Sequence, residues 1–361
     1  MKKRNILYFS LPLFLLVSTF LSAPAAVAEE APFVGDLNGD QVTTAADAAM
    51  MLRGIAFAKL SEQTRPDLDF TRNGEIDATD VRAALFCACG GVTDWVAFGE
   101  RVSSGLCDER LFDRFSYTGT QDDGMGNYKS ANVSVQILSG RADNSDYHVA
   151  DIYIQDISCL MTEFSSGTFD GKARSVRDIF DTVSGGIVAM NGDFYSIHLS
   201  GPVVRNGITY LDRVSNTWDI AVLLSDGVLV TYDFKTLSTE MLSGMNAYQT
   251  WLFGPALLDE NGQAKTKFRS YVQAANPRTV LGYYEPGHYA FITVDGRSRA
   301  SGGMTMQELS RLCQDLGLAS AYNMDGGQSS VLLARDGVIN VPYRNGRSVS
   351  DIIAIRELPE E

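Results

Sequence analysis

A long series of short β-rich runs limits the fold of this chain more than any other feature of its 361 residues. Runs rich in β-branched and aromatic residues, bounded by turn residues, predict strands. The turn pairs Asp226-Gly227, Asn261-Gly262 and Asp336-Gly337 are typical of β-hairpins. The predicted strands are Ala131–Leu138, His148–Ile157, Gly186–Met190, Ala221–Leu224, Val228–Tyr232, Thr279–Tyr284, Tyr289–Val294, Ser330–Ala334 and Asp351–Arg356.

Helical patterns are few in this region. Thr305 and Glu308 form a capping box at the start of one helix, and Gly317 ends it. Its apolar face comprises Met306, Leu309, Leu312, Cys313 and Leu316. A shorter helix is predicted over Ser175–Asp181. Many strands with few helices predict an α+β domain built on twisted, mainly antiparallel sheet.

The N-terminal residues have the pattern of a secretory signal peptide. Three basic residues precede the apolar run Ile6–Leu21, and Ala26-Val27-Ala28 provides small residues at a cleavage site. We therefore expect residues 1–28 to be removed and the protein to be secreted or held at the cell surface. An uncleaved anchor is the alternative. No second apolar run is long enough to span a bilayer, so no stable membrane span is expected after cleavage.

Composition excludes some partners. The formal net charge of −14 argues against nucleic acid or an anionic membrane as the main partner. The five cysteines do not form a disulfide framework. Cys159 and Cys313 lie in apolar contexts typical of buried free thiols, whereas one disulfide among Cys87, Cys89 and Cys107 is possible.

Two stretches near the N-terminus repeat the same spacing of oxygen-bearing side chains. Oxygen ligands stand at positions 1, 3, 5, 9 and 12 of two twelve-residue loops, thirty-three residues apart. They are Asp36, Asn38, Asp40, Thr44 and Asp47 in the first loop, and Asp69, Thr71, Asn73, Asp77 and Asp80 in the second. This spacing wraps oxygen ligands round one calcium ion. A short helical pattern follows each loop, so a small all-α module binding Ca²⁺ is predicted over residues 33–91.

This duplicated loop with Asp at position 12 resembles a type I dockerin. The resemblance implies a cohesin-bearing scaffold protein as partner. Gln41 replaces the glycine at position 6 of the first loop, and Thr71 and Asn73 leave the second loop poor in carboxylates. Both ions are therefore expected to bind weakly. An acidic solvated linker is the alternative, but a linker has no reason to repeat ligand spacing.

The stretch Asn323-Met324-Asp325-Gly326-Gly327-Gln328-Ser329-Ser330 concentrates chemically useful groups. Consecutive glycines allow backbone N–H groups to approach a phosphate or a developing oxyanion. Asp325 would then be an acid, a base or a metal ligand, although a tight turn before a strand is the plainer interpretation. Three further motifs precede this one: Asn191-Gly192-Asp193-Phe194-Tyr195, then Asn276-Pro277-Arg278-Thr279, and then Asp295-Gly296-Arg297 with Ser301-Gly302-Gly303-Met304-Thr305.

These four motifs, in this order, resemble the phosphodiester glycosidase family. The resemblance covers about Tyr117 to Arg356, and we expect the domain to span residues 117–358 after a linker or domain edge over 92–116. Gln328 stands where many members carry a third glycine, and Asp193 where many carry glycine. The resemblance implies an exported hydrolase that cleaves the C1–O bond of a sugar 1-phosphodiester, with an N-acetylglucosamine-type sugar. It establishes no cofactor for this domain.

Cleavage of this kind requires a carboxylate at the anomeric carbon and cations for the phosphate. Asp325 is the first choice as nucleophile or general base, with Asp295 and Asp193 as competing carboxylates. Arg278 and Arg297 are the phosphate candidates, because guanidinium groups pair with two phosphate oxygens at once. The other predicted substrate-binding residues are Asn191, Tyr195, Ser301, Gly326, Gly327 and Ser329.

Other functions remain open from the sequence. A Ser-His-Asp triad is unsupported, because His148, His198 and His288 lie outside the four motifs. The chain could instead be a non-catalytic carbohydrate- or phosphate-binding scaffold protein. It could also be a glycosidase or phosphodiesterase acting on a cell-envelope glycan.

Overall fold

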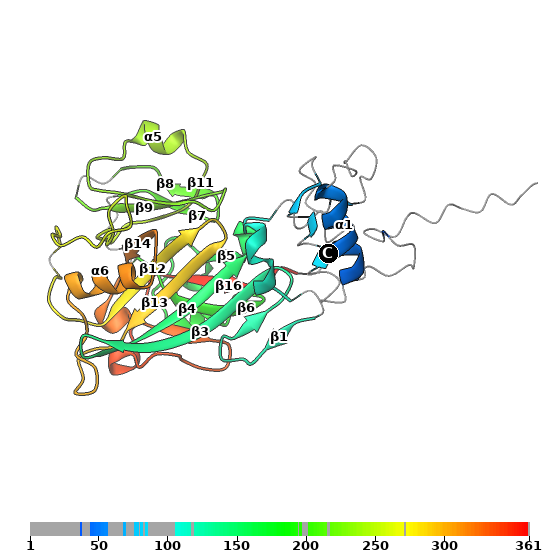
Figure 1. Ribbon diagram of the computed structural model, residues 1–361. Coiled ribbons are helices and arrows are strands. Elements are labelled where there is room, and N and C mark those ends of the chain that lie inside the picture. The colour runs from blue at the N-terminus through cyan, green and yellow to red at the C-terminus, as the bar shows by residue number, and fades with distance from the viewer. Residues whose placement is uncertain are drawn as a thin grey trace, which may run out of the picture.

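The computed structural model describes residues 37, 44–56, 68–69, 76–78, 80–81, 84–85, 105–116, 119–193, 195–196, 201–214, 217–270 and 272–359 (Figure 1). Within these ranges every strand pair in the four sheets is antiparallel. The predicted α+β class with mainly antiparallel sheet is therefore confirmed.

The largest sheet has seven strands in the order β1-β2-β3-β4-β13-β12-β14, and a second sheet has the order β15-β6-β16-β5. The seven strands are β1 (Gln121–Asp122), β2 (Tyr128–Lys129), β3 (Val133–Ala142), β4 (Ser145–Ile154), β12 (Arg278–Glu285), β13 (His288–Val294) and β14 (Ser320–Asn323). The second sheet comprises β5 (Leu160–Phe164), β6 (Gly186–Asn191), β15 (Leu332–Ala334) and β16 (Asp351–Arg356).

These two sheets pack face to face around the main core. Side chains alternate between the faces of a strand, and β13 shows the consequence. Tyr289 and Phe291 point into the core shared with the four-stranded sheet, where they meet residues such as Ile353. Ala290 and Ile292 point to the opposite face.

A helix covers the outer face of each sheet. Helix α6 (Met306–Asp315) packs Met306 and Leu309 on the outer face of the seven-stranded sheet, and Figure 1 shows it lying across β12 and β13. Helix α4 (Val176–Phe180) packs Ile179 and Phe180 on the four-stranded sheet. The domain thus has four layers, helix–sheet–sheet–helix.

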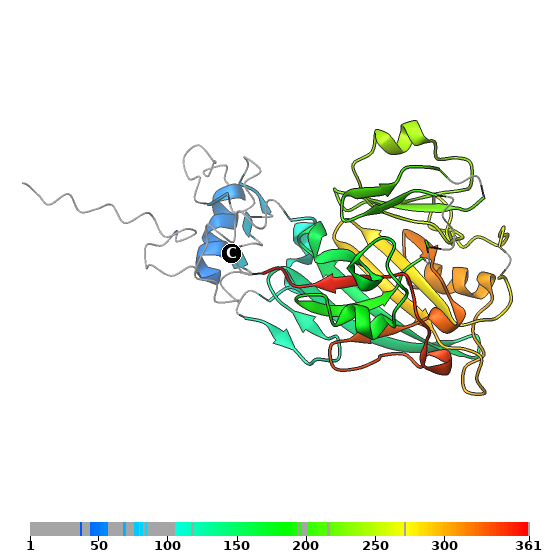
Figure 2. The same ribbon diagram turned by 180° about the vertical axis from the view of Figure 1, so that it is seen from behind.

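A smaller unit extends one end of the sandwich, as the view from behind shows (Figure 2). It contains the sheet β10-β9-β11 and the hairpin β7–β8. Its elements are β7 (Val203–Arg205), β8 (Ile208–Leu211), β9 (Ile220–Leu224), β10 (Leu229–Tyr232), α5 (Thr239–Ser243) and β11 (Ala247–Trp251). Trp251 is fully buried in the main core, so this unit packs as part of the same domain.

The two helices predicted in this domain are both present. Thr305 accepts a hydrogen bond from the Glu308 backbone, and Glu308 accepts one from the Thr305 backbone, which is the predicted capping box. Ser175 caps α4. All nine predicted strands occur, eight of them with shifted ends, whereas β1, β2, β5, β7, β8, β11 and β14 were not predicted.

The segment 105–116, expected to be a linker or domain edge, lies against the sandwich. Cys107 and Phe115 pack with Tyr153 of β4. Cys107 is a buried free thiol, as are Cys159 and Cys313. Burial raises the pKa of the Cys107 thiol to about 12, which keeps it protonated and unreactive. The other two residues of the possible disulfide, Cys87 and Cys89, lie outside the described residues.

The N-terminal module shows the sequence repeat in its contacts. Asp47 accepts the backbone N–H of Thr44 at 2.9 Å, and Asp80 accepts that of Asp77 at the same distance. Asp47 also accepts the N–H of Leu37, ten residues earlier, at 2.9 Å. The position-12 carboxylate therefore closes the first loop on itself, as a ring of calcium ligands requires.

Helix α1 (Ala45–Ala56) begins within the first loop and buries Met51, and Ala84 is buried thirty-three residues later. The described residues include some of the predicted oxygen ligands, Thr44 and Asp47 of the first loop and Asp69, Asp77 and Asp80 of the second. The remaining predicted ligands, Asp36, Asn38, Asp40, Thr71 and Asn73, lie outside the described residues. The signal peptide predicted over residues 1–28 does so too, and no helix in the described ranges has the length and apolar character needed to cross a bilayer.

We predict that calcium stabilises this module alone. Calorimetry of the whole chain should show one transition that moves upward when calcium replaces a chelator, because the ion binds the folded loops only. Asp47→Asn together with Asp80→Asn should abolish this shift, whereas Asp181→Asn, an exposed control on the sandwich, should keep it. A calcium shift of equal size in both transitions would contradict two independently stabilised modules.

Candidate active site

The four sequence motifs meet at one end of the two sheets. Strand β12 begins at Arg278 and runs antiparallel to both β13 and β14. Its first residues therefore lie beside the last residues of its two neighbours, where the motifs of Asp295 and Asp325 begin. The Asn191 motif follows β6 of the facing sheet.

Asn191 connects these motifs. Its Nδ2 donates to the backbone carbonyl of Asp325 at 2.7 Å, and its Oδ1 accepts from Thr279 Oγ1 at 2.9 Å. Oδ1 also accepts the N–H of Val331 at 3.3 Å. Asn191 is fully buried, so in this structure it positions the motif loops and does not itself face solvent.

The two glycines bring the Asp325 loop against neighbouring motifs. A Cβ on Gly326 would stand 2.9 Å from the Pro277 carbonyl oxygen, and one on Gly327 would stand 3.0 Å from a guanidinium nitrogen of Arg297. Gly327 also has a φ of 67°, which favours glycine. Its N–H donates to Pro277 O at 2.9 Å and is thus already engaged. The glycines serve close packing beside Arg297.

The protein binds the carboxylate of Asp325 through only one of its two oxygens. Its Oδ2 accepts from Ser329 Oγ at 2.5 Å and from Arg347 Nη2 at 2.5 Å. Arg347 Nε donates to Ser329 Oγ, also at 2.5 Å. In the described part of the chain both side-chain contacts of Asp325 use Oδ2, which leaves Oδ1 for a ligand or a water molecule.

Sequence reasoning missed Arg347. The available signal was Tyr343-Arg344-Asn345-Gly346-Arg347, a locally basic loop in a chain of net charge −14. Spacing alone could not have found it, because the contact spans 22 positions of sequence.

The two predicted phosphate ligands have different surroundings. Arg297 is exposed, and its Nε and Nη2 both donate to Asn276 Oδ1, at 3.2 and 2.8 Å. Arg278 is 2% exposed and donates to the backbone carbonyls of Met304, Val272 and Ala274. Arg297 can therefore reach a ligand. Arg278 instead stabilises the backbone of the neighbouring segments through these three hydrogen bonds.

Burial, and next the charge of Arg297, lower the pKa of Arg278 to about 10. Arg278 stays protonated at neutral pH. Among the described residues neither arginine has a carboxylate within ion-pair distance. Arg278 and Arg297 therefore give this part of the site a net positive charge.

Asp295 is engaged on both oxygens. Its Oδ1 accepts from Asn340 Nδ2 at 3.1 Å and from the Val341 N–H at 3.0 Å, while Oδ2 lies 3.4 Å from His148 Nε2. Ser301 Oγ, which is buried, donates to the Asp295 backbone carbonyl at 2.7 Å. In this structure Asp295 and Ser301 therefore hold the loop in place.

His148 Nδ1 also lies 2.9 Å from Ser139 Oγ, which puts Ser139, His148 and Asp295 in a line across β3, β4 and the end of β13. This resembles the order of a Ser-His-Asp triad, although the sequence did not support one. The serine is exposed on β3, so the arrangement lies at the surface of the sheet. Phe194 and His198 fall outside the described residues.

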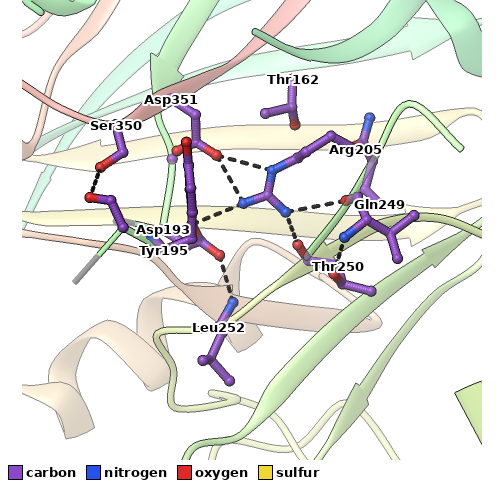
Figure 3. Close-up of polar contacts among 12 residues, drawn as sticks. Thr162, Asp193, Tyr195, Arg205, Gln249, Thr250, Leu252, Ser350 and Asp351 are labelled. Atoms are coloured by element: carbon purple, nitrogen blue, oxygen red, sulfur yellow. Dashed lines mark hydrogen bonds and ion pairs between the residues drawn. The ribbon is translucent and has the colours of Figure 1, made fainter. Parts of the chain in front are cut away.

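Asp193 belongs to a buried ion cluster (Figure 3). Arg205 Nη2 donates to Asp193 Oδ1 at 3.0 Å and to Asp351 Oδ2 at 2.9 Å, and all three side chains are at most 1% exposed. Asp193 Oδ2 accepts the Leu252 N–H at 2.7 Å. Tyr195 stacks on Phe169, and its hydroxyl donates to the Phe169 carbonyl at 2.5 Å. Asp193 and Tyr195 therefore have structural contacts in this fold.

The cluster has two carboxylates for one guanidinium group. Burial raises the pKa of Asp351 from 3.8 to about 7, against the opposing effect of Arg205. A Cβ on Gly192 would stand 2.0 Å from Asp351 Oδ1, so glycine is required beside this carboxylate.

We predict a pH-dependent stability that originates in Asp351. Between its unfolded pKa of 3.8 and its folded pKa of about 7, the folded chain binds a proton that the unfolded chain has released. The free energy of unfolding should therefore fall as pH rises through this window. Urea denaturation at pH 5 and pH 8 should show a smaller fall in Asp351→Asn than in the wild type. An equal fall in both proteins would place the linkage elsewhere.

Comparisons with known proteins agree with this architecture. Residues 184–356 match the phosphodiester glycosidase family, and residues 34–83 match the dockerin type I domain. The fold is similar to the catalytic domain of zebrafish N-acetylglucosamine-1-phosphodiester alpha-N-acetylglucosaminidase, with a TM-score of 0.52 and 19% identity, over 66% of this chain and 88% of that one.

A curated relative, the SPbeta prophage-derived uncharacterized protein YomE of Bacillus subtilis (strain 168), is 25% identical over 161 residues. The match covers 43% of this chain and only 25% of the relative's length. Dockerin type I domains bind calcium, in agreement with the oxygen spacing of the two loops. The chain therefore carries a match to the phosphodiester glycosidase family after a match to the dockerin type I domain, in the order that the sequence motifs predicted.

Proposed function

We propose that this protein hydrolyses the C1–O bond of a sugar 1-phosphodiester, with Asp325 as nucleophile or general base. The observation that carries the proposal is that Gly327, two residues after Asp325, packs against the exposed guanidinium group of Arg297. A carboxylate and a guanidinium group brought together by one loop suit a sugar carbon and its phosphate, respectively.

The contacts of the three aspartates favour this assignment. Asp193 and Asp295 use both carboxylate oxygens in contacts with the protein. Asp325 uses one oxygen, and Arg347 and Ser329 fix its orientation. A positioned carboxylate with one available oxygen is what attack on C1, or proton removal from water, requires.

In the proposed reaction the C1–O bond breaks and the phosphate oxygen keeps the electron pair. Arg297 stabilises the charge that develops on this phosphate, with the positive field of Arg278 behind it. A phosphate monoester is a good leaving group, which lowers the need for a second carboxylic acid. If Asp325 is the general base, it takes a proton from the water that adds its hydroxyl group to C1, and then passes this proton to the released phosphate or to solvent. If Asp325 is the nucleophile, it first forms a glycosyl ester, and water then displaces the carboxylate from C1 and gives its proton to the released phosphate or to solvent.

The similar proteins support the proposed sugar, partner and location. The zebrafish enzyme is named for N-acetylglucosamine-1-phosphodiester, which supports an N-acetylglucosamine-type sugar here. A dockerin type I module supports docking to a cohesin on a scaffold protein. Together with the predicted signal peptide, it supports action outside the cell.

We predict that Asp325→Asn lowers kcat by about a thousandfold or more while the protein keeps its fold, the effect expected for a lost nucleophile or base. Initial rates on a sugar 1-phosphodiester, with circular dichroism for folding, measure this. Asp315→Asn, an exposed aspartate on α6, is the control. Near-normal turnover by Asp325→Asn would transfer the catalytic role to another carboxylate.

Arg297→Gln should raise KM for a sugar phosphodiester by about tenfold or more, because charge-assisted hydrogen bonds to phosphate are lost. A neutral aryl glycoside of the same sugar should show little change in kcat/KM. Arg311→Gln, an exposed arginine on α6, is the matched control. Equal losses on both substrates would show that Arg297 does not bind phosphate.

The bond that breaks can be identified with labelled water. Hydrolysis in H₂¹⁸O should place the label on the released sugar and none on the phosphate, because C1–O cleavage adds water to carbon. Label in the phosphate, together with release of sugar 1-phosphate, would make the protein a phosphodiesterase that cleaves O–P.

A further inference from the structure

Residues Tyr343–Arg347, here named the arginine arm, have an unusual backbone. Arg344, Asn345 and Gly346 have φ values of 51°, 62° and 82° in succession. Two consecutive non-glycine residues in the left-handed region cost free energy, and such geometry persists only where the surroundings fix it. Contacts with neighbouring residues must therefore stabilise the backbone of the arginine arm.

The Asp325 loop holds the arm at two points. Gln328 Nε2 donates to the Gly346 carbonyl oxygen at 2.8 Å. The next residue, Arg347, bonds to Asp325 and Ser329. The loop that carries the proposed catalytic carboxylate thus fixes the arm beside itself.

The arm presents positive charge at the rim of the site. The guanidinium carbons of Arg344 and Arg297 lie 5.2 and 5.1 Å from the Tyr343 ring centroid, and both side chains are exposed. Among the described residues no carboxylate pairs with either of them. Arg347 is paired with Asp325, and buried Arg278 adds a further charge behind Arg297. Cations thus outnumber the carboxylates that face them.

We propose that Arg344 and Tyr343, with Arg297 shared, form a second phosphate-binding position that Gln328 holds in place, so that the preferred aglycone carries a second phosphate group. This inference rests on the proposed function, which places the scissile phosphate at Arg297. Arg344 makes no contact with Asp325 among the described residues. It therefore discriminates between substrates without taking part in bond cleavage.

The proposed ligand carries two phosphate groups, each within reach of one of two neighbouring guanidinium groups. Two compounds test for such a ligand. Pyrophosphate has directly linked phosphates, as in a diphosphate aglycone. Glycerol 1,3-bisphosphate has phosphates separated by carbons, as in a polyol phosphate chain. Inorganic phosphate is the reference ligand, because it can occupy the Arg297 position alone.

Titration calorimetry on the full chain measures the three dissociation constants. Arg344→Gln should weaken whichever two-phosphate ligand binds the wild type more tightly by about tenfold, and should change the phosphate constant by about twofold at most. Arg269→Gln is the matched control, because this exposed arginine lies over the Phe234 ring much as Arg344 lies over Tyr343.

Gln328→Met keeps the side-chain length but removes the donor to Gly346. It should weaken the same two-phosphate ligand by about fivefold, the value of one lost hydrogen bond that positions the arm. Gln307→Met removes an equivalent 2.8 Å bond, from an exposed glutamine of α6 to the Thr266 carbonyl, and should leave binding unchanged.

Loss of phosphate and two-phosphate binding to the same extent in Arg344→Gln would overturn the inference, as would no loss of either. The proposed function is tested separately, by turnover. If the wild type shows no turnover and Arg344→Gln weakens two-phosphate binding, the proposed hydrolysis is refuted and the second phosphate position stands. If the wild type shows turnover and Arg344→Gln binds the two-phosphate ligand as the wild type does, the second phosphate position is refuted and the hydrolysis stands.

Discussion

The side-chain amide of Asn191 is the contact on which the site depends. An asparagine side chain offers two donor hydrogens and two acceptor lone pairs, and all four have partners here. The donors go to the carbonyls of Gly192 and Asp325, and the acceptors serve Thr279 and Val331. The contact joins β6 of one sheet to the loops of the other. A buried amide with unmet partners would destabilise the fold, so the position of Asp325 is fixed by the packing of the two sheets.

The aspartates of the motifs differ in how many contacts the protein makes with them. In Asp193 and Asp295 both carboxylate oxygens accept hydrogen bonds from the protein. Asp193 pairs with Arg205, and Asp295 bonds to the segment at Asn340 and Val341. Asp325 is oriented by Arg347 and Ser329 through Oδ2 alone. A carboxylate must exchange contacts with substrate during a reaction, and one already saturated by backbone donors would have to break them first. The geometry thus separates three residues that look alike in the sequence.

Much of the fold could be predicted from local signals. The capping box of α6, the cap of α4 and the hairpin turns depend on residues within a few positions of one another. Strand β14 could not be found in this way, because its four residues carry no clear alternation and it is defined by pairing with β12. The convergence of the motifs could be expected from their resemblance to a family. The contrast between Arg278 and Arg297 could not, because it is set by burial.

Arg347 shows the same limit for the site itself. Its partner Asp325 lies 22 positions away, and only the turn of the arginine arm brings them together. That turn needs left-handed φ values at Arg344 and Asn345, which no propensity rule would assign to an arginine. Asparagine is the more tolerant of the two in this region. Local rules therefore fail where tertiary contacts impose a costly backbone, and such places are often functional.

The position of the arginines also limits what can approach them. A protein of net charge −14 repels a long polyanion over distances of about one Debye length, roughly 8 Å at physiological ionic strength. Arg278, Arg297 and Arg344 create a local positive field that acts mainly within that range. A short phosphorylated ligand interacts mainly with this local field, whereas an extended polyanion such as nucleic acid also meets the repulsion of the net negative charge. The local charge therefore favours phosphate groups at this point, and the net charge disfavours long polyanions.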